Sequence, residues 1–169
     1  NMAYATIKNK LKVSNNKSVN DIISKTFSEF EIEVGKTLTY KSLFQLMNIV
    51  ATSAKLQSNY FAISDFMVEI YGLVSEKQKE IKTDKHLFYH IEILNLMAVT
   101  HFRNKNFKAS VSFSEKMETE MQKRNRTYYN RFLEKLTLIK AFNQNYTGLG
   151  PEAIEILKSF PRASFDVEL

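Results

Sequence analysis

The chain has 169 residues, of which 44% are hydrophobic and 25% are charged, a composition typical of one globular domain. It contains no cysteine, which excludes disulfides and thiolate metal sites, and no apolar run approaches the roughly 18 residues needed to cross a bilayer. The 24 Lys and Arg residues against 18 Asp and Glu residues give a net charge of +6, which favours an anionic partner without identifying one.

Apolar residues recur every three or four positions along most of the chain, which predicts helices joined by short polar turns. Residues 1–37 predict a less regular helical pair, whose second helix ends at Gly35. Three clearer helical hairpins follow, at about residues 38–80, 84–125 and 127–160. Thr83 and Asp84 predict the N-terminal cap of the second hairpin. The chain is therefore predicted to be a single all-α domain of about eight helices.

The first two hairpins match each other at an offset of 47 residues. The matching pairs are Asn48 and Asn95, Ala51 and Ala98, Asn59 and Asn106, Tyr60 and Phe107, Ala62 and Ala109, and Phe66 and Phe113. In the third hairpin, Ala141 matches Ala98 at an offset of 43, and Ala153 matches Ala109 at an offset of 44. A nearly constant period in this range is typical of stacked helical repeats.

With these residues, the chain resembles the tetratricopeptide-repeat (TPR) family over roughly residues 38–160. The family's units are helix–turn–helix pairs with small residues where the two helices cross. The corresponding pairs here are Ala51 with Ala62, Ala98 with Ala109, and Ala141 with Ala153. The chain departs from the family in its longer period, against about 34 residues, and in lacking the characteristic tryptophan and the proline at the repeat end. The resemblance implies a right-handed α-solenoid of antiparallel helical hairpins.

In such a solenoid, the first helix of each hairpin lines a concave surface that is used for binding. By position relative to the small residue, the resemblance places on this surface Gln45, Asn48, Thr52 and Lys55, then Glu92, Asn95, Val99 and Phe102, and finally Lys135, Leu138 and Phe142. We call these residues the candidate face. Asn48 and Asn95 share one repeat position, and their amides can hydrogen-bond a peptide backbone as donor and acceptor. The alternative is that both amides bond across neighbouring helices.

Two further groups of residues suggest other ligands. His86 and His90 are four residues apart on one helix, a spacing at which two imidazoles can chelate a metal. No third ligand stands at a suitable spacing, so we expect a surface pair of histidines and neither a metal nor a cofactor. The basic stretch 123–126, followed by Tyr128 and Tyr129, suits phosphate contact and base stacking. The alternative needs no nucleic acid: cations are favoured at a helix C-terminus, and the tyrosines can pack inward at the start of the next helix.

The sequence contains no glycine-rich phosphate loop, no Gly-x-Ser-x-Gly motif and no paired carboxylates in an apolar context, so we expect no enzymatic activity. We expect a cytoplasmic protein- or peptide-binding scaffold with no membrane or nucleic-acid partner. The alternatives are a ligand-sensing module of a bacterial regulator and a basic nucleic-acid-binding helical domain. Ile154, Ile156 and Leu157 keep the last helix apolar, which predicts that the C-terminal end contacts a further repeat or a second copy of the chain.

Overall fold

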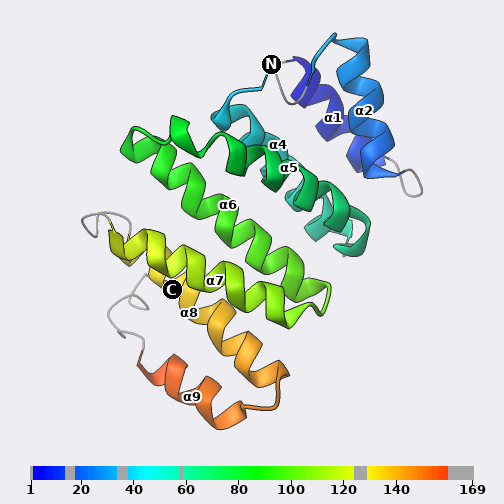
Figure 1. Cartoon of the computed structure of the whole chain (residues 1–169). Coiled ribbons are helices and arrows are strands. Elements are labelled where there is room, and N and C mark those ends of the chain that lie inside the picture. The colour runs from blue at the N-terminus through cyan, green and yellow to red at the C-terminus, as the bar shows by residue number, and fades with distance from the viewer. Residues whose placement is uncertain (1, 14–17, 34–37, 58, 124–128, 160–169) are drawn as a thin grey trace, which may run out of the picture.

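The computed structural model describes residues 2–13, 18–33, 38–57, 59–123 and 129–159 (Figure 1). Within these residues all regular structure is helical, which confirms the all-α prediction. The eight α-helices of the described residues are α1 (Met2–Val13), α2 (Val19–Glu29), α4 (Tyr40–Gln57), α5 (Ser64–Glu76), α6 (Asp84–Arg103), α7 (Phe107–Lys123), α8 (Tyr129–Tyr146) and α9 (Gly150–Lys158). The short 3-10 helices η1 (Phe61–Ile63) and η2 (Gln78–Glu80) precede and follow α5. None of the described helices is long and apolar enough to span a membrane.

The helices pack mainly against their neighbours in the chain. Helix α1 packs on α2, α4 on α5, α6 on α7, and α8 on α9. The first helix of each pair also contacts the first helix of the next pair, so that α1 meets α4, α4 meets α6, and α6 meets α8. Figure 1 shows the pairs following one another in chain order, from α1 and α2 at one end to α9 at the other.

The three hairpin turns share one backbone hydrogen bond, in which an N–H bonds the carbonyl five residues earlier. These bonds run from Asn59 N to Ala54 O, from Asn106 N to His101 O, and from Leu149 N to Gln144 O, at 3.0, 2.9 and 2.9 Å. This is the Schellman arrangement, in which the residue before the donor takes a left-handed conformation. Lys105 and Gly148 hold that position, with φ of 61° and 86°. All three turns therefore share this hydrogen bond, and the turns after α6 and α8 also share the left-handed conformation.

Helix α2 ends earlier than predicted, by the same arrangement. Ile32 N donates to Phe27 O at 2.9 Å, and Glu31 takes the left-handed conformation with φ 52°. The helix therefore stops at Glu29, ahead of Gly35, which lies outside the described residues. The predicted N-cap of α6 is confirmed, because Thr83 Oγ1 accepts a 3.2 Å hydrogen bond from the backbone N–H of His86.

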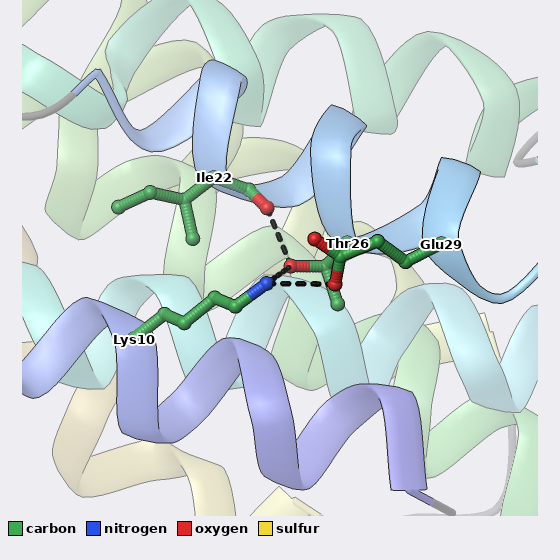
Figure 2. A network of polar contacts seen from close by, with 4 residues as sticks. All are labelled: Lys10, Ile22, Thr26 and Glu29. Carbon is green, nitrogen blue, oxygen red and sulfur yellow. Dashed lines mark hydrogen bonds and ion pairs between the residues drawn. The ribbon is translucent and has the colours of Figure 1, made fainter.

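A polar network joins α1 to α2 (Figure 2). Lys10 Nζ donates to Glu29 Oε2 at 2.8 Å and to Thr26 Oγ1 at 3.2 Å. The hydroxyl of Thr26, which is fully buried, donates in turn to Ile22 O at 2.7 Å. The hydrogen bond from Lys10 is the main reason that the pKa of Glu29 lies below its usual range.

The small residues at the helix crossings are placed differently from the prediction in two hairpins. Ala51, Ala98, Ala141 and Ala153 are buried as expected, but Ala62 is exposed and Ala109 is only half-buried. In the second hairpin the residue against Ala98 is Ser110, which is fully buried. A helix turns by about 100° per residue, so the shift of one position moves Ala109 away from the contact. The offset of 47 residues could not reveal this shift. It aligns every residue of the first hairpin with one of the second, and does not show which aligned residues face the other helix.

Candidate binding surface

The four candidate residues of α4 are exposed, namely Gln45, Asn48, Thr52 and Lys55. Asn48 and Thr52 border a small hollow of about 150 Å³ between α1 and α4, which Lys8 and Lys12 line from the side of α1. The first helical pair therefore continues the surface beyond the residues that the repeat identified.

The candidate residues of α6 are half-buried, because α4 and α8 flank this helix on both sides. Two contacts join them to the candidate residues of α8. Lys135 Nζ donates to Glu92 Oε1 at 2.7 Å, and the rings of Phe102 and Phe142 stack with their centroids 5.8 Å apart. Asn95 and Val99 lie between these two contacts on α6, and Leu138 lies between them on α8 and is 38% exposed. The structure thus brings the candidate residues of the second and third hairpins together.

The two asparagines at the shared repeat position, Asn48 and Asn95, have amide groups without a hydrogen-bond partner among the described residues. Asn48 is exposed and Asn95 is half-buried, and neither amide makes a hydrogen bond within the described part of the chain. Bonds across neighbouring helices therefore do not account for them. Both amides retain a donor and an acceptor for a ligand.

Four aromatic rings, which we call the aromatic cluster, gather where α6 and α8 end. Phe102 contacts Phe107, Phe142 and Tyr146, with centroid distances of 5.8, 5.8 and 5.3 Å. Phe107 also stacks on Tyr146 at 5.8 Å. Phe142 and Tyr146 are 47% and 63% exposed, so the cluster presents apolar area to solvent. The repeat positions predicted only Phe102 and Phe142 for the site, although the match of Phe107 with Tyr60 was a signal that the turn carries an aromatic residue.

A second hollow, of about 550 Å³, lies where the turn after α4 meets the end of α6. It is lined by Lys55, Asn59, Tyr60, Phe61, Arg103, Asn104 and Lys105, and we call it the basic hollow. Asn104 Nδ2 donates to Tyr60 O at 3.3 Å and so links the two turns. The guanidinium carbon of Arg103 lies 5.8 Å from the centroid of the Tyr60 ring. Of these residues, only Lys55 belongs to the candidate face.

The prediction of a surface histidine pair is wrong. His90 is buried, and its Nδ1 lies 2.7 Å from the hydroxyl of Tyr40, which is itself fully buried. His86 lies beside the same ring, with centroids 6.3 Å apart. Both imidazoles therefore pack against α4. Within the described residues, no group of three or more His, Cys, Asp or Glu side chains is placed to hold a metal ion.

Two further sequence hypotheses fall at the edge of the described residues. Of the basic stretch and its tyrosines, residues 124–128 lie outside the described residues, while Lys123 ends α7 and Tyr129 begins α8. On α9, Ala153 is buried, whereas Ile154 and Leu157 are 54% and 47% exposed. The apolar face of the last helix is thus open within the described residues, and the contact of the C-terminal end stays a prediction. Comparison of the chain with protein-family models, with curated proteins and with solved structures found no match.

Proposed function

We propose that this chain is a peptide-binding scaffold, built as a right-handed α-solenoid of TPR-like hairpins, that holds an extended peptide across the candidate face. The observation that carries the proposal is the row of accessible groups on α4, α6 and α8, three first helices that contact one another in sequence order. Extended binding surfaces of this kind are the usual product of stacked helical repeats.

The chemistry of the row suits a peptide. The free amides of Asn48 and Asn95 can pair with peptide N–H and C=O groups, while Phe142 and Leu138 offer apolar area to a side chain. Helices that pack about 8–10 Å apart place α4 and α8 roughly 16–20 Å from each other, the span of about five or six extended residues. The Lys135–Glu92 ion pair and the Phe102–Phe142 stack already order both helices, so binding requires little rearrangement. The proposal assigns the chain no catalytic role.

Selection from a random-peptide display library tests the proposal. Peptides selected on the intact chain are then titrated by calorimetry against Asn48→Ala, Asn95→Ala and Phe142→Ala. Loss of one peptide hydrogen bond at either asparagine is expected to weaken binding by roughly twofold to tenfold, and loss of the Phe142 ring by at least as much.

The matched controls are Gln122→Ala on α7 and Val68→Ala on α5, which remove a polar and an apolar exposed side chain from second helices. Affinities for the selected peptides should be unchanged in both. If no peptide is selected, or if the selected peptides bind all five variants equally, the candidate face is not a peptide site.

A further inference from the structure

The basic hollow carries positive charge that the described residues do not neutralise. Its lining includes Lys55, Arg103 and Lys105 and no carboxylate. None of these three cations forms an ion pair within the described residues, in contrast to Lys10, Lys135, Lys140 and Lys158. Three like charges around one space repel one another, and a bound anion would remove that repulsion. The volume of the basic hollow, about 550 Å³, falls within the usual range for small-molecule sites.

The ends of the helices do not explain these cations fully. Lys55 and Arg103 stand in the last turns of α4 and α6, where a cation interacts favourably with the helix dipole. Carbonyls of these last turns are already bonded, however, since Ala54 and His101 accept from the backbone of the turns. Lys105 lies beyond the helix, in a left-handed conformation that the equivalent turn gives to Gly148. A lysine thus occupies a position where a glycine would be less strained.

Aromatic rings border the same space. Phe61 is 85% exposed although it lies in an ordered 3-10 helix, so its ring makes almost no contribution to the core. Tyr60 is half-buried, and the guanidinium carbon of Arg103 lies 5.8 Å from the centroid of its ring. The planar fork of a guanidinium matches the geometry of a phosphate. Cations beside exposed rings are the combination that binds the phosphate and the base of a nucleotide, because every base has a π-face.

Asn59 and Asn104, which line the basic hollow, add one hydrogen-bond donor and one acceptor. Asn59 Oδ1 accepts from Ala62 N at 3.2 Å, so its NH₂ group remains a donor. Asn104 uses its NH₂ group on Tyr60 O, so its carbonyl oxygen remains an acceptor. A donor suits a phosphate oxygen, and an acceptor suits an exocyclic amine or a ring N–H of a base.

We propose that the basic hollow binds a nucleotide unit, with the phosphate at Lys55, Arg103 and Lys105 and the base against Phe61 and Tyr60. The unit can be a free mononucleotide or part of a single strand, which present the same phosphate and base. An acidic peptide would use the cations and leave the exposed ring of Phe61 without a role. The site borders the proposed peptide surface and shares Lys55 with it.

Titration of the intact chain with thymidine monophosphate and with a short fluorescent oligothymidylate tests the inference. Both probes are expected to bind at low salt, with affinity that falls steeply as salt is added. Arg103→Gln should weaken binding roughly tenfold or more, and Phe61→Ala by roughly fivefold to a hundredfold. A higher affinity for the oligothymidylate than for the mononucleotide would identify a single-stranded nucleic acid as the ligand. Equal affinity for the two probes would identify a free nucleotide as the ligand.

Lys85→Gln is the matched control, because Lys85 is an exposed cation at the opposite end of α6, roughly 27 Å from Arg103 along the helix. It should leave the affinity unchanged, and thermal melts should show Phe61→Ala folded like the parent. The inference is overturned if neither probe binds or if Lys85→Gln weakens binding as much as Arg103→Gln. It is equally overturned if inorganic phosphate binds as tightly as the nucleotide, or if a polyglutamate peptide binds more tightly than the oligothymidylate.

Discussion

The hydroxyl of Ser110 donates a 2.9 Å hydrogen bond to the backbone carbonyl of Ala98, between α7 and α6. Asn143 of α8 donates to the same hydroxyl oxygen at 2.9 Å. All three residues are buried, at 0%, 0% and 2% exposure. A short polar chain therefore ties three helices together where small side chains let their backbones approach.

Replacing Ala98 by leucine should destabilise the fold. The site is completely buried against Ser110, so added methylene groups would force the helices apart, at a cost of about 1–3 kcal/mol in the free energy of unfolding. Chemical denaturation measures the change. Ala62→Leu is the control, since Ala62 is exposed, and Ala109→Leu at a half-buried position should cost less than Ala98→Leu. Equal midpoints for Ala98→Leu and the parent would show that this position is not a helix crossing.

Substitutions at the left-handed turn positions should act in opposite directions. Lys105→Gly relieves a φ of 61° and should stabilise the chain by about 1 kcal/mol or less. Gly148→Ala imposes a side chain at φ 86° and should cost roughly 1 kcal/mol, although no atom lies within 4 Å of the added carbon. Thermal melts of both variants provide the comparison. The same sign for the two changes would contradict the equivalence of the turns.

His101 should make stability depend on pH. Its ring is buried and stacked on Phe113, and burial lowers the pKa of the imidazole below its usual 6.5. Between the two pKa values the unfolded chain binds more protons than the folded chain, so the free energy of unfolding falls as pH drops below about 6.5. In His101→Gln this fall should be smaller, because the variant lacks the buried imidazole. Denaturation curves of the parent and of His101→Gln across this pH range measure the difference. If the free energy of unfolding depends on pH equally in both, His101 makes no contribution.

The Lys10–Glu29 contact should be visible in the titration of Glu29. The lowered pKa means that stabilisation is present above the usual value of 4.5 and is lost as pH falls through the lowered pKa. Lys10→Gln should return the pKa of Glu29 toward its usual range, as carboxyl NMR chemical shifts would record. Lys25→Gln, which removes only a weaker charge interaction, should shift this pKa less. A larger effect of Lys25→Gln would argue against the contact.

The sequence by itself determined the local structure of this protein. Apolar spacing predicted the helices, and Thr83 predicted a cap. The offset of 47 residues matched Asn59 with Asn106, and in the structure the Oδ1 of each accepts at 3.2 Å from the backbone N–H three residues later. These features depend on residues within one or two helical turns of each other, so the order of residue types contains them.

Only the tertiary structure decided which residues of different helices meet. It put Ser110 rather than Ala109 against Ala98, turned His90 inward onto Tyr40, and joined Lys55 to Arg103 and Lys105 around one hollow. These contacts depend on the rotation of each helix about its axis and on how the helices cross. A shift of one residue rotates a side chain by about 100°, and a repeat period does not contain that information.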